Sequence, residues 1–300
     1  MLRWRLLLGI LIIAALVALC WLDAKSTVPG LWLLPLAMIV AVLCTAELLN
    51  LARAVGLRPL RRPVVFGNIL LVASGWLAML EQAWRQGWPP LEGNTGYAWE
   101  FVVPSVFGAA VLLVFLGEMW RYEKPGGNTA NLATGVFALV YIGMTLCFAV
   151  QLRIVWGIGA LAAWVIAVKM GDVGAYTVGR LIGRHKMAPL LSPGKTVEGA
   201  IGALAFSCLG SWLAFRWLVP LATPEWVEPG PQWGWIAFGL LVGAAGMIGD
   251  LAESLLKRDA GRKDSSDWLP GFGGVLDILD SLLLSAPVAW FCWAFGLVGR

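Results

Sequence analysis

Residues 31–52 read LWLLPLAMIVAVLCTAELLNLA, an almost wholly apolar run that is long enough to cross a bilayer. A transmembrane helix needs about 20 such residues, and its internal hydrogen bonds satisfy the backbone in hydrocarbon. Eight further runs of this kind occur along the chain, so the sequence predicts nine spans. Their approximate boundaries are 4–22, 31–52, 64–82, 101–119, 131–150, 154–170, 198–219, 234–256 and 276–297.

The composition agrees with a membrane protein. Of 300 residues, 59% are hydrophobic and only 13% are charged, about half the usual charged share of a soluble domain. Because so few polar side chains could not coat a soluble fold of this size, the composition excludes a soluble enzyme, a disordered chain and a nucleic-acid-binding module. We therefore expect an all-α polytopic transmembrane helical bundle that has no nucleic-acid partner.

The distribution of lysine and arginine predicts the orientation. If the N-terminus is cytoplasmic and nine spans alternate, 17 of the 22 basic residues lie on the inner side, as the positive-inside rule requires. The first run follows Arg3 and Arg5, but no A-x-A cleavage site comes after it, so we expect a retained first span. The expected location is a multi-pass integral membrane protein, in the cell inner membrane if the source is bacterial.

The polar residues that suggest chemistry lie after residue 168. We therefore divide the chain into N-terminal transmembrane helices, 1–150, and a C-terminal transmembrane catalytic region, 151–300. The second part contains two predicted cytoplasmic loops, at 171–197 and 257–275.

The first of these loops has a composition that suits phosphate. Residues 171–199 read GDVGAYTVGRLIGRHKMAPLLSPGKTVEG, and glycines let backbone N–H groups approach an anion closely. Ser192, Lys195 and Thr196 come just before an apolar run, where a helix N-terminus also favours anions. The alternative is a basic inner loop with turn glycines. His185, the only histidine, stands in a basic stretch and is expected on the surface.

The second stretch, residues 249–281, carries acidic residues into two apolar runs. Asp277 and Asp280 are three apart at the start of the last run and share a helical face. Four polar residues before them fall at i, i+3, i+4 and i+7 of a helix: Asp250, Glu253, Ser254 and Lys257.

Two such groups of carboxylates invite a cation. Carboxylates about 4 Å apart repel by roughly 4 kcal/mol at an effective dielectric constant of 20. Mg²⁺ would remove this repulsion, and it favours carboxylates together with substrate phosphates. We expect Asp250 and Asp277 to share one ion, with their carboxylates within about 8 Å of each other. The alternative is an internal salt bridge of Asp250 or Glu253 with Lys257, which leaves Asp277 and Asp280 unmatched.

At these residues the sequence resembles the phosphatidate cytidylyltransferase (CDP-diacylglycerol synthase) family. One matching block is D-x-x-A-Y-x-x-G-R at 172–180 with S-P-x-K-T-x-E-G at 192–199. The other is S-L-L-K-R at 254–258, K-D at 263–264, P-G-x-G-G at 270–274 and L-D-x-x-D-S at 276–281. Three positions depart from the family pattern: Phe272 replaces a histidine, Ile278 an arginine, and Gly194 a frequent lysine.

The resemblance implies that CTP and phosphatidic acid react to give CDP-diacylglycerol and pyrophosphate in phospholipid biosynthesis, with one or two Mg²⁺ ions. The site would open at the inner membrane face. Metal ligands would be Asp250 and Asp277, then Asp280 and Asp172. Catalytic residues would be Asp250, Asp277, Lys257, Arg258, Lys263 and Asp264. Substrate-binding residues would be Ser192, Lys195, Thr196, Arg180, Tyr176, Glu253 and Ser254.

Other functions stay open at this point. One is a CTP-dependent enzyme that acts on an isoprenoid phosphate or a lipid alcohol. Another is a cation-coupled transporter, although its polar residues should spread over several spans near the midplane. Phe272 and Ile278 also leave an inactive paralogue open, and we expect Ile278→Arg to raise turnover about ten-fold if the arginine reaches a phosphate. The expected partners are CTP, phosphatidic acid and the bilayer, with a homodimer left open.

Overall fold

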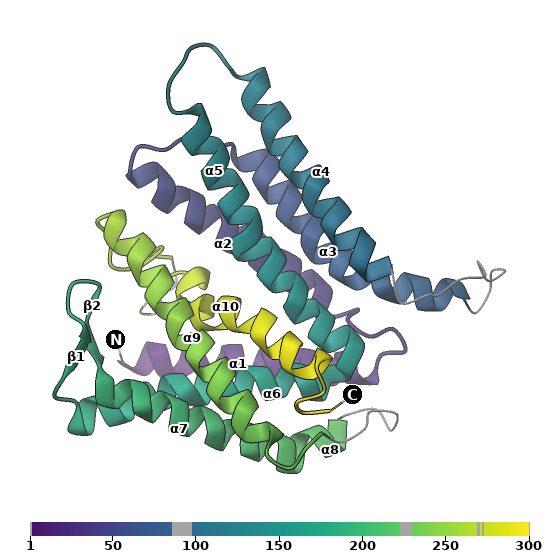
Figure 1. Cartoon of the computed structure of the whole chain (residues 1–300), viewed down its shortest axis with the longest axis vertical. Coiled ribbons are helices and arrows are strands. Elements are labelled where there is room, and N and C mark those ends of the chain that lie inside the picture. Colours follow the sequence, from purple (N-terminus) through teal and green to yellow (C-terminus); the bar gives the residue numbers. More distant parts are fainter. Residues whose placement is uncertain (1, 86–97, 223–229, 269–270, 272, 300) are drawn as a thin grey trace. The chain divides into compact units, whose positions relative to one another are not determined.

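The computed structural model of the chain describes residues 2–85, 98–222, 230–268, 271 and 273–299, and it is almost entirely helical (Figure 1). The chain forms two compact units. The first unit comprises Met1–Ile154 and Asp264–Leu276, and the second comprises Val155–Lys263 and Asp277–Arg300. The first unit therefore includes a short segment that lies far along the sequence, between the last two helices.

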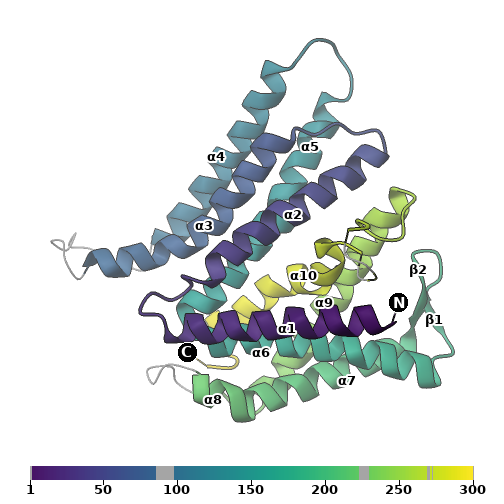
Figure 2. The same ribbon diagram turned by 180° about the vertical axis from the view of Figure 1, so that it is seen from behind.

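The first unit is a helical bundle in which α3 and α4 lie side by side (Figure 2). Its apolar core includes Leu49, Leu71 and Ile142, all fully buried. Gly67 of α3 faces Ala110 of α4 so closely that a larger side chain would not fit. The elements are α1 (Leu2–Lys25), α2 (Leu33–Ala54), α3 (Arg61–Arg85), α4 (Ala98–Trp120), α5 (Asn128–Ala138), the π-helix η1 (Leu139–Met144) and the first turns of α6 (Thr145–Ile182).

Two ion pairs that involve buried carboxylates stabilise the first unit. Asp23 is fully buried, and it accepts hydrogen bonds from Arg153 Nε at 2.6 Å and from the backbone N–H groups of Gly30 and Trp32. Glu118 is also buried and pairs with Arg121 at 2.9 Å. Each carboxylate thus has a cationic partner, which a buried charge requires.

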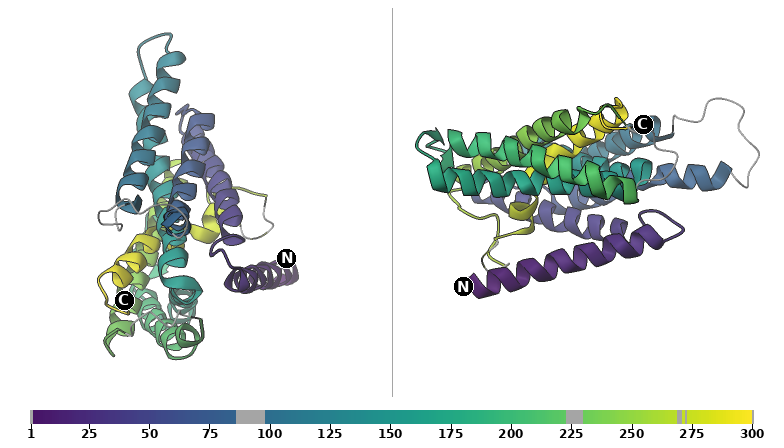
Figure 3. Two further views of the ribbon diagram at one scale, coloured as in Figure 1. Left: turned by 90° about the vertical axis from the view of Figure 1, so that its right-hand side faces the viewer. Right: turned by 90° about the horizontal axis from the view of Figure 1, so that it is seen from below.

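The second unit is also helical and carries a small antiparallel hairpin. Figure 2 shows this hairpin between the end of α6 and the start of α7, and Figure 3 shows these two helices side by side. Besides most of α6, its elements are β1 (Lys186–Ala188), β2 (Ser192–Thr196), α7 (Val197–Leu213), the π-helix η2 (Ala214–Leu218), α8 (Val219–Ala222), α9 (Gly234–Asp259) and α10 (Val275–Ala294).

Glycines bring the helices of the second unit into backbone contact. A side chain at Gly174 of α6 would collide with α7, and one at Gly239 of α9 would collide with the backbone of Cys208. A side chain at Gly249 of α9 would meet the carbonyl of Asp280 in α10. Small residues allow such close approach between helices in membranes. The last contact brings Asp250, the next residue of α9, to the start of α10.

All nine apolar runs coincide with helices. Six stretches of the described chain are long and apolar enough to cross a membrane, namely Leu33–Ala54, Val102–Trp120, Asn128–Ile182, Val197–Ala222, Gly234–Asp259 and Val275–Ala294. These six establish an integral membrane protein without confirming the count of nine. The third stretch covers two predicted runs, and its helix is interrupted at Gly157, where φ is 84° and ψ is −176°. The runs 4–22 and 64–82 are the helices α1 and α3.

The structure differs from the predicted loop at 171–197. Helix α6 continues to Ile182, so Asp172, Tyr176 and Arg180 lie on a helix. Glycines in this stretch suggest a loop by propensity, but Gly171 and Gly174 face α7, and tertiary packing outweighs that propensity. The predicted loop at 257–275 agrees more closely, since α9 ends at Asp259 and α10 begins at Val275.

Candidate active site

The hairpin places Lys195 beside an acidic residue of α9. Lys195 Nζ lies 2.8 Å from Asp250 Oδ2, and both side chains are partly exposed. Next to it, Thr196 is buried and its hydroxyl oxygen accepts a hydrogen bond from Gly199 N at 3.1 Å. Thr196 therefore caps α7, which fixes the helix start that follows Lys195.

His185 lies on the surface, as the sequence predicts. Its imidazole is 80% exposed, and Nδ1 lies 2.6 Å from Glu198 Oε1. The Glu198 carboxylate also accepts hydrogen bonds from the backbone N–H groups of Arg184 and His185. Glu198, in the first turn of α7, therefore connects that helix to the residues just before the hairpin.

A lysine of α6 joins that helix to α10. Lys169 Nζ donates to Asp172 Oδ2 at 2.9 Å, to the carbonyl of Ile278 at 2.9 Å and to Ser281 Oγ at 3.0 Å. Ser281 Oγ in turn donates to Asp172 Oδ2 at 3.0 Å. The ammonium therefore stands beside the position at which Ile278 replaces the family arginine.

Tyr176 and Arg180 follow Asp172 along the same stripe of α6. Arg180 Nη1 donates to the Tyr176 hydroxyl at 2.5 Å, and both residues are exposed. They are one and two turns beyond Asp172, so they could meet a ligand that approaches the end of the helix.

Lys257 links two carboxylates near the end of α9. Its Nζ lies 2.5 Å from Glu253 Oε2 and 2.6 Å from Asp277 Oδ1. Glu253 is fully buried, and the neighbouring Ser254 is nearly so. The salt bridge considered as an alternative is therefore present, and it also includes Asp277.

The remaining predicted residues lie where α9 ends. Arg258 Nε donates to the carbonyl of Leu191 at 3.2 Å, which ties α9 to the hairpin turn beside Ser192. Lys263 and Asp264 are exposed in the connection between α9 and α10. Phe272 lies outside the described residues.

Most of the acidic residues of the second unit belong to one group, the carboxylate–lysine cluster. Asp280 connects its parts, because its carbonyl lies against Gly249, the residue before Asp250, and the next residue, Ser281, is hydrogen-bonded to Lys169 and Asp172. Five carboxylates face three lysines, which leaves two formal negative charges. The cluster consists of Lys169, Asp172, Lys195, Asp250, Glu253, Lys257, Asp277 and Asp280.

The donor set fits a magnesium ion that needs substrate to complete its coordination. Among the described residues, no three acidic, histidine or cysteine side chains converge as a finished metal site. Mg²⁺ is usually held by one or two carboxylates, with phosphates and waters filling the other positions. The excess negative charge and the hard carboxylate oxygens of the cluster suit such an ion. That Asp250 and Asp277 share it stays a prediction.

Two residues of evident importance were missed in the sequence. Lys169 ends an apolar run and was counted only toward the orientation. Glu47 is the single charge within residues 31–52, and its buried carboxylate accepts four hydrogen bonds. Both are ionisable residues within predicted spans, and this property could have identified them. Placing such a residue inside a membrane costs free energy, so it usually has a functional role.

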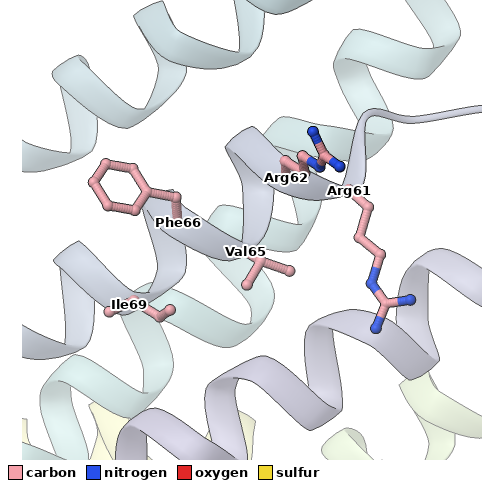
Figure 4. A pocket seen from close by; sticks show the side chains of 5 residues that line it. All are labelled: Arg61, Arg62, Val65, Phe66 and Ile69. Atoms are coloured by element: carbon pink, nitrogen blue, oxygen red, sulfur yellow. The ribbon is translucent and has the colours of Figure 1, made fainter.

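A hollow on α3 offers no comparable chemistry. It has a volume of about 400 Å³ and is lined by Arg61, Arg62, Val65, Phe66 and Ile69 (Figure 4). Its lining contains two cations and no carboxylate, so it lacks the ligands that a metal-dependent reaction requires.

The helical spans define an integral membrane protein, and its second unit carries the carboxylate–lysine cluster. The chain belongs to the cytidylyltransferase family, whose model matches residues 3–295. Similarity to individual proteins is consistent with this. Over 196 residues the chain is 33% identical to a phosphatidate cytidylyltransferase of Mycobacterium bovis, covering 61% of each chain.

Two other relatives carry the same name. A phosphatidate cytidylyltransferase of Chlamydia muridarum is 38% identical over 195 residues, which cover 62% of this chain and 61% of the relative. One from Synechocystis is 40% identical over 124 residues, 40% of this chain and 38% of the relative. The chain thus spans between about two fifths and three fifths of the length of these relatives.

Proposed function

We propose that the protein is a phosphatidate cytidylyltransferase, which makes CDP-diacylglycerol and pyrophosphate from CTP and phosphatidic acid for phospholipid biosynthesis. The observation that carries the proposal is the carboxylate–lysine cluster, which combines an excess of carboxylates with three lysines at the ends of apolar helices. Membership of the cytidylyltransferase family supports a nucleotide substrate, and the name shared by the relatives supports the lipid.

The reaction needs alignment and charge neutralisation more than proton transfer. A phosphate oxygen of phosphatidic acid attacks the α-phosphorus of CTP, and the bond from that phosphorus to the β-phosphate oxygen breaks to release pyrophosphate. A phosphomonoester has a second pKa near 6, so this nucleophile is largely ionised at neutral pH. The only histidine, His185, is therefore not needed as a general base.

Lysines and arginines of the second unit would hold the phosphates. Lys195 of β2 and Lys257 of α9 are each paired with carboxylates, and a bound triphosphate would compete for their ammonium groups. Arg258 lies beside the hairpin turn, where it could contact the same ligand as Ser192. Lys263 and Asp264 are exposed, which suits contact with a soluble nucleotide.

The carboxylates would hold one or two Mg²⁺ ions. Asp250 and Asp277 are the first candidate ligands, and Asp280 and Asp172 are the second. A bound Mg²⁺ ion would neutralise charge that develops on the transferring phosphoryl group. Glu253 and Ser254 are buried beside this group and would support Lys257 rather than contact the nucleotide.

We also propose nine spans with a cytoplasmic N-terminus and the site on the cytoplasmic side. The helical stretch Asn128–Ile182 contains 55 residues, about 80 Å of helix at 1.5 Å per residue, which is more than twice the hydrocarbon thickness. The interruption at Gly157 would divide it into two spans. Cysteine accessibility at Lys124→Cys, with Lys25→Cys as the opposite-side control, tests the orientation.

The test of the reaction uses purified protein in lipid nanodiscs with labelled CTP, phosphatidic acid and Mg²⁺. CDP-diacylglycerol and one pyrophosphate per lipid product are expected, and chelation of Mg²⁺ should stop both. Product with an isoprenoid phosphate or a lipid alcohol, and none with phosphatidic acid, would assign a different lipid substrate. Nucleotide-independent ion flux in liposomes would instead indicate a transporter, and CTP binding without product would indicate an inactive paralogue. Mass photometry tests the homodimer.

A further inference from the structure

Glu47 of α2 is a buried carboxylate whose two oxygens are fully used. Oε1 accepts hydrogen bonds from Trp268 Nε1 at 2.8 Å and from Val275 N at 3.0 Å. Oε2 accepts from Ser265 Oγ at 3.1 Å and from Leu276 N at 2.8 Å. A carboxylate has about four acceptor positions, and here each oxygen takes two donors. The side chain is only 5% exposed.

All four donors belong to one segment. Residues 264–276 connect α9 with α10 and belong to the same compact unit as α2. Val275 and Leu276 lie in the first turn of α10, where backbone N–H groups have no partner within the helix. Glu47 therefore acts as an N-terminal cap supplied by another helix, and its negative charge suits the positive end of the helix dipole.

The glycines of this segment support the same assignment. Gly271 and Gly273 both have φ of 85°, a left-handed conformation that favours glycine. Gly274 requires glycine for a different reason, because a side chain there would collide with the Glu47 carboxylate and with Ser265 Oγ. The last glycine of the P-G-x-G-G sequence thus leaves room for Glu47.

We infer that Glu47 is a positioning residue, which fixes the start of α10 and thereby the place of Asp277, the third residue of the capped first turn. The inference rests on the proposed function, in which Asp277 is a metal ligand. A carboxylate is required because its two oxygens serve four donors. Glutamine has one acceptor oxygen, and its NH₂ group would face N–H groups that need an acceptor.

The first measurement is hydrogen–deuterium exchange of the full-length protein in nanodiscs. Glu47→Gln should raise the exchange rates of the Val275 and Leu276 amides about ten-fold or more, because these N–H groups lose their acceptor. Glu118→Gln is the matched control, since it also removes a buried carboxylate from the first unit but has its own partner, Arg121. It should leave exchange at residues 273–278 unchanged.

The second measurement is steady-state kinetics. Misplacement of a catalytic group by about 1 Å can cost about a hundred-fold in rate, so kcat of Glu47→Gln should fall by that order. The Mg²⁺ concentration for half-maximal activity should rise, while the KM for phosphatidic acid stays close to that of the wild type. A residue that only stabilised the fold would lower Tm without this separation. Trp268→Phe, which removes one donor, should show a smaller effect of the same kind if Glu47→Gln does not fold.

The outcomes distinguish this inference from the proposed function. Unchanged amide exchange at residues 275 and 276 in both Glu47→Gln and Trp268→Phe would overturn the capping role. Faster exchange with unchanged kcat and Mg²⁺ dependence would overturn positioning for catalysis. If the wild type makes no CDP-lipid, the proposed function fails, whereas faster exchange in Glu47→Gln would still support the cap.

Discussion

The two units of the molecule hold their charged side chains differently. In the first unit Asp23 is matched by Arg153, Glu118 by Arg121, and Glu47 by four neutral donors. In the second unit, by contrast, five carboxylates share three lysines. Matched charges inside a membrane protein hold helices together. We propose that the second group, in which carboxylates outnumber lysines and which we call the unmatched group, serves a further cation, and that this difference separates structural from chemical residues.

The largest expected effect breaks a matched pair of the first unit. Arg153→Met leaves Asp23 buried without its cation, which typically costs about 3–5 kcal/mol of unfolding free energy. Thermal unfolding in detergent should show a large drop in Tm, while kcat per folded molecule stays near that of the wild type. Arg216→Met, at an exposed arginine, is the control. A Tm equal to the control would show that the pair contributes no stability.

The second effect removes a lysine from the unmatched group. Lys257→Ala takes away two charge-assisted hydrogen bonds, to Glu253 and Asp277, and the proposed phosphate contact. Such a bond contributes about 1.5–3 kcal/mol, so turnover should fall about a hundred-fold. Lys124→Ala, at an exposed lysine of the first unit, should not change it. Normal kinetics with normal expression would reduce Lys257 to a determinant of orientation.

A third prediction tests whether the unmatched charge serves a metal. Asp250→Asn removes one carboxylate from the cluster, so the Mg²⁺ concentration for half-maximal turnover should rise about ten-fold or more. Asp259→Asn, at an exposed aspartate near the end of the same helix, is the control. The two variants are compared in a Mg²⁺ titration of initial rates. Identical curves would argue against a metal at Asp250.

The smallest effect concerns Ile278. The sequence suggests a ten-fold gain from Ile278→Arg, but Lys169 already lies 2.9 Å from the Ile278 carbonyl. A second cation beside Lys169 would stabilise a bound phosphate only about as much as a partly exposed ion pair does. We therefore expect Ile278→Arg to raise turnover less than about five-fold. Lys169→Met should remove the existing charge, so Ile278→Arg should raise turnover more when it is combined with Lys169→Met than when it is made alone. Equal gains with and without Lys169 would show that the lysine does not substitute for the arginine.

Much of the fold could be predicted because apolar runs of about 20 residues specify helices directly. A break between the runs 131–150 and 154–170 was predicted, but its position at Gly157 could not be, since nothing in the neighbourhood of Gly157 distinguishes it from the glycines that remain helical. The extension of α6 through Asp172 was also missed. When the sequence is considered alone, the glycines of this stretch indicate a loop. Their packing against α7 shows why they are tolerated within a helix.

The candidate site was predictable where neighbours in sequence share a helical face. The spacing from Asp250 to Lys257 predicted a salt bridge of Lys257 with Asp250 or Glu253, and the structure contains the one with Glu253. Contacts between distant segments were not accessible in the same way. The partners of Lys169 lie 109 and 112 residues away, at Ile278 and Ser281, and Glu47 reaches residues more than 200 positions along the chain.

The backbone contacts made by glycines in the second unit have a consequence for how sequence variation in this protein should be interpreted. Gly174, Gly202 and Gly249 lie where even a methyl group would separate two helices. Alanine at these positions should therefore be tolerated as poorly as a change to a carboxylate of the cluster, although these three glycines have no side chain that could act on a substrate. In a saturation mutagenesis screen for growth, intolerant positions would include both kinds. Only a second screen for protein abundance would separate the residues that bring the helices together from those that act on the substrate.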